Sequence, residues 1–450
     1  MSWPSRRART FPHGVHPPEE KQFARDVPIE VVPTPAAVAI PLLQHLGAPC
    51  QAVVASRATV ALGDVVGRAE APVSAPVHAS IAGVVQRESV ATLPNGRHVT
   101  TVPIKAAGEQ LEGQALYDAH FGGDWPLAGL DEIAPAEIVA AAGEAGLVGM
   151  GGAAFPTHVK LAPGPRRPVD TVLINGCECE PYLTADERLM REAALPVLVG
   201  AKLVARAVGA KRIVVGIEAN KPEAIAEMRR LAPELGIEVG VVATKYPQGA
   251  EKQLVYALLQ RIVPGGKLPL DVGVVVSNVA TAAALARAVL RGAPLTHRVM
   301  TVAGHGVREP KNLLVPIGLR LSEAIEAAGG LTDDAARVIA GGPMMGFSVA
   351  YLDAPVTKGT SGLTVLAARD LDAEPERACV RCGRCVDVCP MGLLPTRIAL
   401  AARYGEWELA GSYHARLCVE CGCCAFACPS RLPLVQLIRV AKARLAKMTA

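Results

Sequence analysis

The sequence predicts a multidomain α/β and α+β chain in which smaller modules flank a larger parallel-sheet domain. Its 450 residues are enough for about three domains. Half of the residues are hydrophobic, but only 4% are aromatic and 20% charged, which excludes disordered, collagen-like and coiled-coil chains. Strand-length and helix-length segments alternate through the middle of the chain, and nine of the twelve cysteines lie between Cys379 and Cys428.

The charge balance and the hydropathy restrict where the protein acts. The net charge is +4, with no basic stripe of the kind that binds nucleic acid. The most apolar stretch, residues 272–290, is interrupted by Ser277, Asn278, Thr281 and Arg287, whereas a membrane span needs about 20 predominantly apolar residues. No signal-peptide core follows the basic N-terminus. We therefore expect a cytoplasmic chain that reaches a membrane only through partners.

The N-terminal part predicts an extended arm and a β-module. Residues 1–30 are rich in Pro, Arg and His, and we expect them to form the arm. Residues 31–115 contain short β-type runs separated by turns. Two of these runs resemble the halves of a biotinyl/lipoyl-type barrel-sandwich hybrid. Modified members of that class carry a lysine where this chain has His78 and Ala79, so we expect an unmodified structural module.

Residues 120–297 predict an α/β domain with a parallel sheet. Four strand-type runs alternate with helix-like sequence such as residues 193–208. The runs cover residues 172–174, 212–217, 239–243 and 272–276. Polar loops follow three of them, at residues 175–182, 246–253 and 277–281. Ligands bind at the carboxyl ends of strands in open sheets of this kind, so we expect a binding site at these loops.

Two further segments precede the cysteine-rich end of the chain. Residues 298–352 predict a small α+β module with a strand at 299–303, a helix at 322–328 and a glycine-rich loop at 341–346. Residues 353–375 are expected to be a linker. Residues 376–450 form the cysteine-rich domain.

A cysteine repeat carries the strongest chemical signal. The pattern Cys379-x2-Cys382-x2-Cys385-x3-Cys389-Pro390 recurs 39 residues later as Cys418-x2-Cys421-x2-Cys424-x3-Cys428-Pro429, with helix-type sequence at 395–403 between the runs. Soft thiolates and the wide fourth spacing favour iron–sulfur clusters over a tetrahedral zinc ion. Two structural zinc sites are the alternative.

The repeat has the spacing of bacterial two-cluster ferredoxins, in which the fourth cysteine of each run ligates the other cluster. One [4Fe–4S] cluster is therefore predicted on Cys379, Cys382, Cys385 and Cys428, and a second on Cys418, Cys421, Cys424 and Cys389. Cys423 fits neither run and is expected to be a packing thiol. Cys50, Cys177 and Cys179 lie outside the repeat, and such cysteines are most often buried small hydrophobes.

A glycine-rich loop at residues 149–160 is the candidate cofactor loop. It lacks the Gly-Lys-[ST] ending of a Walker A loop, and it follows a helix-like stretch at 137–145 and not a strand. Clustered glycines let backbone amides approach a phosphate or a flat ring, and Lys160 supplies positive charge. A purely structural turn explains the loop equally well.

Together these motifs resemble the RnfC family, peripheral subunits of the Rnf ion-translocating ferredoxin:NAD oxidoreductase complexes. The resemblance rests on segments 14–18, 151–156, 178–182, 245–247 and 341–346 and on the double cysteine run. The loop set is also similar to the NADH-binding subunit of respiratory complex I, whose GGAGFP-type loop holds FMN. Ala154 stands where that loop usually has Gly.

The resemblance implies a barrel-sandwich hybrid, a Rossmann-like FMN-binding domain, a β-grasp module of the soluble-ligand-binding (SLBB) type and a double [4Fe–4S] ferredoxin-like domain. It implies an oxidoreductase and translocase subunit that passes electrons between NAD(H), non-covalent FMN and two clusters, with no catalytic side chain. It places the protein on the cytoplasmic side of the bacterial inner membrane. Its partners are the other Rnf subunits, with ferredoxin or flavodoxin reached indirectly.

The same resemblance implies which residues hold the nucleotides. The expected FMN contacts are Gly149, Gly151, Gly152, Lys160, Asn175, Asn278 and Thr281. The expected residues near the nicotinamide nucleotide are Glu178, Glu180, Tyr246 and Glu251. An ordinary loop residue is the alternative for each. Two other functions stay open, a flavin and iron–sulfur cobalamin reductase of propanediol metabolism and a cluster-only electron relay.

Overall fold

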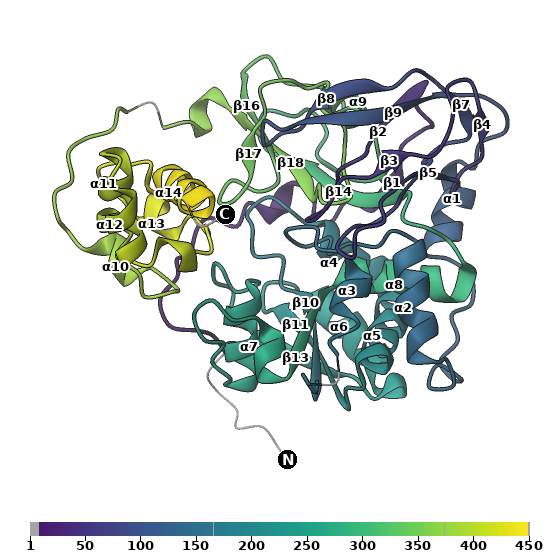
Figure 1. The fold of residues 1–450 in the computed structure, drawn as a ribbon, viewed down its shortest axis with the longest axis horizontal. Coiled ribbons are helices and arrows are strands. Elements are labelled where there is room, and N and C mark those ends of the chain that lie inside the picture. Colours follow the sequence, from purple (N-terminus) through teal and green to yellow (C-terminus); the bar gives the residue numbers. More distant parts are fainter. Residues whose placement is uncertain (1–8, 165, 373, 449–450) are drawn as a thin grey trace.

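The computed structural model describes residues 9–164, 166–372 and 374–448, so the first eight residues of the expected arm lie outside it. Within these residues the strands form four sheets, and a helical C-terminal lobe lies to one side (Figure 1). No helix in the described part of the chain is both long and apolar enough to cross a bilayer.

The N-terminal β-module consists of two antiparallel sheets around a core of Val and Ile side chains. One sheet contains β2 (Ala37–Pro41), β9 (His98–Ala106), β7 (Gly83–Val85), β4 (Thr59–Val60) and β8 (Ser89–Thr92). The other contains β3 (Gln51–Ala52), β5 (Val65–Arg68) and β6 (Val77–His78). His78 is buried within β6, so it does not occupy the exposed hairpin tip that a modified residue requires.

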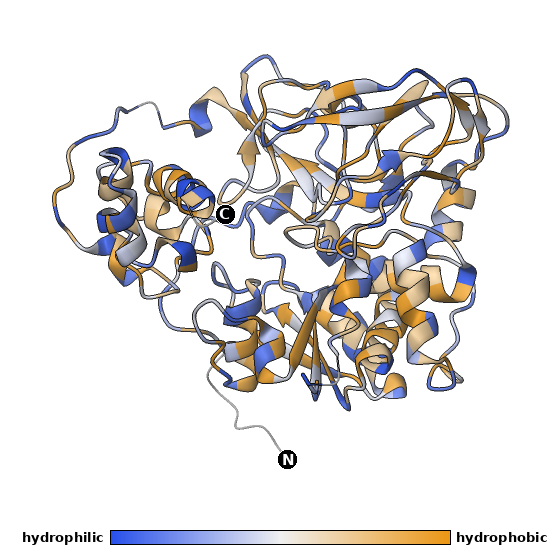
Figure 2. Cartoon of the chain, in the orientation of Figure 1, coloured by the Kyte–Doolittle hydropathy of each residue, from blue (hydrophilic) through white to orange (hydrophobic). Residues whose placement is uncertain are grey.

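The α/β domain has a four-stranded parallel sheet in the order β12-β11-β10-β13. The strands are β10 (Thr171–Gly176), β11 (Arg212–Glu218), β12 (Glu238–Val242) and β13 (Val274–Asn278). The four predicted strand-type runs are therefore confirmed as strands. Successive apolar residues point to opposite faces of the sheet. Val172 packs in the core beneath α5 and α8, and Leu173 packs in the core beneath α7. Figure 2 shows the resulting hydrophobic strands of this sheet.

Helices cover both faces of this sheet, as βαβ connections require. They are α2 (Pro135–Glu144), α3 (Thr157–Lys160), α4 (Ala185–Glu192), α5 (Ala194–Val208), α6 (Pro222–Leu231), α7 (Glu251–Leu259) and α8 (Val279–Arg291). A further helix, α1 (Gly113–His120), joins the β-module to this domain. The apolar stretch at 272–290 thus divides into one buried strand and one helix.

The third sheet is mixed and has the strand order β1-β15-β14-β18-β16-β17. Its elements are β1 (Ile29–Val31), β14 (His297–Ala303), β15 (Lys311–Pro316), β16 (Ala335–Ala340), β17 (Phe347–Ser348) and β18 (Gly362–Ala367), with α9 (Leu321–Ala327) packed on it.

Two boundary predictions near this sheet are wrong. Residues 353–375 are not simply a linker, because all six residues of β18 are buried between β14 and β16. The short apolar run at 363–367 is a strand buried on both faces, which shows no polar alternation. The arm also ends earlier than expected, since β1 pairs with β15 from Ile29 onward.

The C-terminal lobe preserves the internal repeat of its sequence. It contains α10 (Arg384–Asp387), α11 (Pro395–Arg403), α12 (Trp407–Ser412), α13 (Cys423–Phe426) and α14 (Leu434–Met448). The helices α13 and α14 start 39 residues after α10 and α11 respectively, the same period as the cysteine pattern. The helix expected at 395–403 is confirmed as α11.

Candidate functional site

The glycine-rich loop lies against the N-terminus of α8. The Gly149 amide donates to the Phe155 carbonyl at 2.9 Å, which closes the loop on itself. The Met150 amide donates to Thr281 Oγ1 at 2.9 Å. The first turn of α8 therefore positions the loop directly.

Asn278 connects the loop, the sheet and the helix. Its Oδ1 accepts hydrogen bonds from the Ala280 amide at 2.8 Å and the Thr281 amide at 3.4 Å, so it caps α8. A β-carbon on Gly151 would lie 2.7 Å from Asn278 Nδ2, whereas Gly152 is exposed and faces open space. Free backbone amides beside a helix N-terminus bind phosphate groups, so this edge suits the phosphate of a flavin nucleotide.

Lys160 adds positive charge at the same edge of the sheet. Its Nζ donates to Glu251 Oε1 at 3.0 Å and to the Val276 carbonyl at 3.0 Å, near the end of β13. Both side chains of this ion pair remain partly exposed. An incoming phosphate can therefore reach Lys160 by competing with Glu251.

The structure gives Asn175 and Glu178 partners within the protein. Asn175 Nδ2 donates to the Gly249 carbonyl at 2.7 Å, so it holds the loop after β12. The Glu178 carboxylate accepts hydrogen bonds from the amides of Asp186 at 2.7 Å and Glu187 at 3.1 Å, at the start of α4. Both residues shape the site through these contacts.

Glu180 lies at a junction between two modules. Its carboxylate accepts hydrogen bonds from the amides of Met344 at 3.0 Å and Met345 at 2.8 Å, in the glycine-rich loop at 341–346. Burial raises the pKa of Glu180 to about 7, although the two amides and the Lys21 ammonium act in the opposite direction. The carboxylate thus joins the α/β domain to the third sheet.

Lys21 is a functional candidate that the sequence analysis missed. It is buried, and its Nζ donates to the carbonyls of Glu178 at 2.7 Å and Glu180 at 2.8 Å and also to that of Leu183. The arm therefore fixes the backbone of the 178–183 loop. Nothing in the sequence distinguishes this lysine from a solvated one.

Tyr246 lies at the boundary between the α/β domain and the cysteine-rich lobe. It is 1% exposed, and its Oη donates to the Cys421 carbonyl at 2.6 Å. Its backbone pairs with Val15 of the arm in both directions, each at 2.9 Å. The structure therefore places Tyr246 against the second cysteine run.

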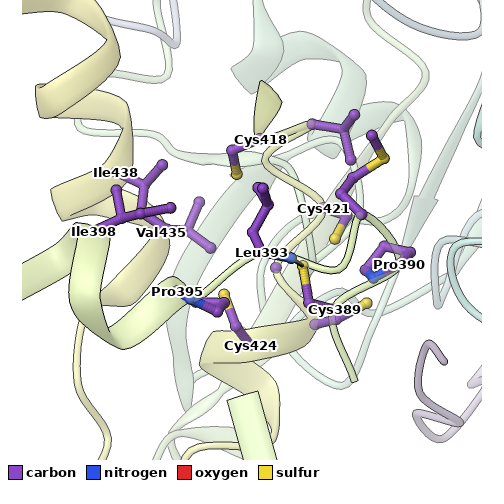
Figure 3. Close-up of a pocket in the computed structure, with 14 residues that line it drawn as sticks. Cys389, Pro390, Leu393, Pro395, Ile398, Cys418, Cys421, Cys424, Val435 and Ile438 are labelled. Carbon is purple, nitrogen blue, oxygen red and sulfur yellow. Dashed lines mark hydrogen bonds between the residues drawn. The ribbon is translucent and has the colours of Figure 1, made fainter. Parts of the chain in front are cut away.

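Four of the eight repeat cysteines line one pocket (Figure 3). They are Cys389, Cys418, Cys421 and Cys424, the set predicted to share a cluster. The pocket is otherwise lined mainly by apolar side chains such as Leu393 and Ile438. Amides of Leu393 and Glu420 donate to the sulfurs of Cys389 and Cys418 at 3.4 Å and 3.3 Å. Amide donors of this kind stabilise thiolates that ligate iron, so the donor set fits a [4Fe–4S] cluster.

The other predicted set is Cys379, Cys382, Cys385 and Cys428. The Arg381 amide donates to Cys379 Sγ at 3.4 Å, matching the Glu420 contact of the second run. Cys385 Sγ lies 2.7 Å from Thr396 Oγ1, and Cys428 packs against the same core as Cys385. Within the described residues no three metal-binding side chains converge on a single-ion site, so the ligand assignment rests on spacing and on these contacts.

The remaining cysteines are mostly buried. Cys50, Cys177 and Cys423 are 5%, 0% and 0% exposed, as packing thiols should be. Cys423 Sγ approaches the Tyr246 carbonyl at 3.9 Å. Cys179 Sγ accepts a hydrogen bond from the Gly249 amide at 3.3 Å. None of these four cysteines is a predicted cluster ligand.

Sequence comparisons identify the family. The chain is 41% identical to the RnfC-type subunit of the proton-translocating ferredoxin:NAD(+) oxidoreductase complex of Clostridium ljungdahlii, over 87% of this chain and 84% of the relative. It is 42% identical to the equivalent subunit of the Na⁺-translocating complex of Acetobacterium woodii, over 96% of both chains. It is also 42% identical to that of the ion-translocating oxidoreductase complex of Rhodobacter capsulatus, over 96% of this chain and 83% of the relative. The chain belongs to the RnfC family.

Models of four domain families match the chain in the order that this membership implies. They are the RnfC barrel sandwich hybrid domain at residues 9–109, the Nuo51 FMN-binding domain at 142–287, the SLBB domain at 299–348 and a 4Fe-4S dicluster domain at 378–432. The fold class predicted from the sequence is thus confirmed. These matches favour RnfC over the cobalamin-reductase alternative and give FMN and [4Fe–4S] clusters as the cofactor classes.

One solved structure shares the fold of this RnfC-family chain. A chain of the NAD⁺-reducing [NiFe]-hydrogenase in the H₂-reduced state superposes with a TM-score of 0.51 at 22% identity. The match covers 70% of this chain and 63%, less than two thirds, of the hydrogenase chain. It supports the architecture alone.

Ala154 departs from the glycine usual in the FMN loop, yet it keeps a left-handed backbone. Its φ is 53°, a region that costs an ordinary L-residue about 1 kcal/mol and that glycine occupies freely. Alanine at this position therefore adopts a backbone conformation that glycine also reaches.

Proposed function

We propose that this chain is the peripheral subunit that carries electrons between NAD(H) and the rest of an ion-translocating ferredoxin:NAD oxidoreductase complex. The observation that supports it most directly is the Tyr246–Cys421 hydrogen bond of 2.6 Å. It joins the domain with the glycine-rich loop to the lobe with the cysteine pocket. One chain thus carries both a nucleotide edge and an iron–sulfur lobe in direct contact.

The residues proposed to hold FMN are those at the α8 edge. The Gly149 amide closes the loop on the Phe155 carbonyl, the backbone amides of Gly151 and Gly152 receive the phosphate beside the first turn of α8, and Lys160 supplies the positive charge. Asn278 and Thr281 keep the loop and the helix in register. Bound FMN supplies the conversion between a two-electron hydride and single electrons.

The acidic residues are proposed to act by shaping the site. Glu178 orders the start of α4, and Glu180 holds the 341–346 loop, so their carboxylates face backbone amides. Asn175 positions the Gly249 segment. Glu251 remains partly exposed beside Lys160 and is the acidic side chain available to a nicotinamide nucleotide.

The cysteines are proposed to hold two [4Fe–4S] clusters, one on each crossed set of four. The apolar pocket of the second set limits water around the sulfurs, and the amide donors of Leu393 and Glu420 offset part of the thiolate charge. The polypeptide thereby tunes the potential of whichever cluster these residues hold.

The names of the relatives support an assignment of partners. Each of the relatives compared is named as one subunit of a larger complex. We infer that this chain binds the other subunits of such a complex at the cytoplasmic face of the membrane, and that ferredoxin or flavodoxin exchanges electrons with it indirectly.

Cofactor content tests the proposal. The chain purified without oxygen should contain about eight iron atoms and one non-covalent FMN per polypeptide. Cys382→Ser and Cys421→Ser should each lose about four iron atoms and keep the flavin. Two zinc atoms in place of iron, or no flavin in a chain with full iron, would contradict it.

A further inference from the structure

The two cysteine runs have the same backbone but different surroundings. Arg381 and Glu420, which are equivalent in the repeat, have φ values of 57° and 58°. Gly383 and Gly422, also equivalent, have φ values of 79° and 86°. Each run closes with an amide-to-sulfur hydrogen bond at the same position. Differences between the runs therefore come from what packs on them.

Residues 419–422 of the second run are covered, whereas the equivalent residues 380–383 of the first run are exposed. Cys421 is 8% exposed, whereas the equivalent Cys382 is exposed to solvent. Val380 is 68% exposed, whereas the equivalent Val419 packs beside Tyr246 and Cys423. A β-carbon on Gly383 would meet nothing within 4 Å. On Gly422 it would lie 2.5 Å from the Met344 carbonyl oxygen.

Three separate parts of the chain contact the second run or the residues on either side of Cys389, the first-run cysteine that is predicted to ligate the same cluster. Tyr246 of the α/β domain donates to the Cys421 carbonyl at 2.6 Å, and Gln253 of α7 lies 3.4 Å from the Pro390 carbonyl. Arg439 of α14 donates to the Met345 carbonyl at 3.2 Å, which ties the 341–346 loop to the lobe. In the arm, the Gly14 amide donates to the Val388 carbonyl at 3.0 Å.

We propose that the site of Cys418, Cys421, Cys424 and Cys389 is the inner one, held against the flavin-type domain by Tyr246, and that the site of Cys379, Cys382, Cys385 and Cys428 is the outer one, where an external electron carrier docks. The inference rests on the proposed function for the identity of the cofactors. It adds the order of the two sites and the docking face.

The order fixes the sequence in which electrons taken from NADH would visit the two sites. Oxidation of one NADH to NAD⁺ releases one proton to solvent and two electrons. With clusters bound, these electrons would pass singly through the inner site to the outer one, and each transfer would oxidise its donor and reduce its acceptor by one electron. The carrier reaches the outer site over residues 380–384, where Arg381 and Arg384 are exposed. An acidic surface on the carrier complements these two guanidinium groups.

Hydrogen–deuterium exchange on the anaerobically prepared full chain tests the order without any activity readout. Because the two runs share their backbone, their amides form a matched pair. We expect amides at 419–424 to exchange at least about tenfold more slowly than those at 380–385. Equal rates, or faster exchange in the second run, would overturn the proposal.

Two variants probe the contacts, each with its own control. Tyr246→Phe should speed exchange at 419–424 and leave 380–385 unchanged, whereas Tyr404→Phe, at a site 77% exposed, should change neither segment. Gly422→Ala should speed exchange at 419–424 because of the Met344 carbonyl, and Gly383→Ala should disturb only its own run. Equal effects of Tyr246→Phe on both runs would overturn the assignment.

A redox titration separates this inference from the proposed function. Tyr246→Phe removes the hydroxyl dipole beside the inner site. This should lower the midpoint potential of one EPR-distinguishable cluster and leave the other unchanged. A chain without FMN or without NADH-dependent reduction would contradict the proposed function, while its exchange pattern would still decide the inner and outer positions. Equal shifts of both potentials would overturn the order.

Discussion

Gly151 is the residue at which the candidate FMN edge has least space. An added β-carbon would lie 2.7 Å from Asn278 Nδ2 and 2.9 Å from Asn278 Cβ. We expect Gly151→Ala to push the loop from α8 and to weaken FMN binding by about tenfold or more, roughly 1.4 kcal/mol. Flavin fluorescence quenching on the flavin-depleted chain measures the dissociation constant.

Gly143→Ala is the matched control for this loop variant. Gly143 lies in α2, where a β-carbon would make only an ordinary contact of 3.6 Å with His158. Its alanine variant should bind FMN as the parent chain does. Unchanged FMN affinity in Gly151→Ala would mean that the loop does not carry the phosphate.

Lys358, which lies outside the candidate cofactor sites, should make the free energy of unfolding depend on pH. It is fully buried, and its Nζ donates to the carbonyls of Pro76 at 2.6 Å and Gly146 at 2.7 Å. Burial lowers its pKa to about 7, against about 10.4 in an unfolded chain. Between these values the unfolded chain binds more protons, so stability should rise from pH 7 to pH 10 by up to about 4 kcal/mol.

Urea unfolding of the parent chain and of Lys358→Met across this range checks the effect. The difference in unfolding free energy between the two proteins should change in favour of the parent chain as the pH rises. A difference that stays constant with pH would contradict a lowered pKa at Lys358. Because the variant lacks only this titrating group, other ionisable residues cancel in the comparison.

At the residue scale the sequence marks candidate ligands more clearly than it marks positioning contacts. The eight cysteines are recognisable because soft ligands repeat at fixed spacing. By contrast, Glu178 and Glu180 are acidic loop residues of the kind expected near a nicotinamide nucleotide. Their carboxylates instead accept hydrogen bonds from backbone amides of other segments. Such long-range partners leave no local pattern in the chain, and the same holds for Lys21 and Tyr246.

Helix α8 is the element that organises the nucleotide edge, and its cap is testable. Asn278→Ala removes the acceptor for two amides and also the donor to Asp186 at 2.7 Å. We expect a loss of about 1–2 kcal/mol in unfolding free energy, measured in urea. Asn278→Ser keeps a capping oxygen and should recover most of this loss. Equal stability of parent and Asn278→Ala would contradict the capping role.

Helices and strands whose sequence has a clear hydrophobic pattern can be predicted from the sequence. The positions of the others depend on contacts with distant parts of the chain. The runs that became β10, β11, β12 and β13 stand out because buried parallel strands are continuous apolar segments bounded by turns. The strand β18 has a similar run, but it follows polar and glycine-rich sequence that favours a linker. Its place between β14 and β16 depends on pairing across more than sixty residues of chain, counting from Thr301 to Gly362.

The arm holds modules together at the scale of the whole molecule. Lys21 donates to three carbonyls of the 178–183 loop and is 3% exposed. Lys21→Met leaves these acceptors unpaired, and we expect a loss of about 2–3 kcal/mol in urea unfolding. Lys105→Met, on the exposed face of β9, should cost little. Equal effects of the two variants would show that the arm does not brace the loop.

The contact between the α/β domain and the cysteine-rich lobe lets one chain join nucleotide and cluster chemistry. An anaerobic NADH titration of the purified chain, followed by visible absorbance and EPR, tests it most directly. We expect the flavin to bleach and both clusters to become reduced as NADH is added, with one NADH supplying about two single-electron reductions. Intact clusters that stay oxidised in the presence of NADH and bound flavin would contradict it.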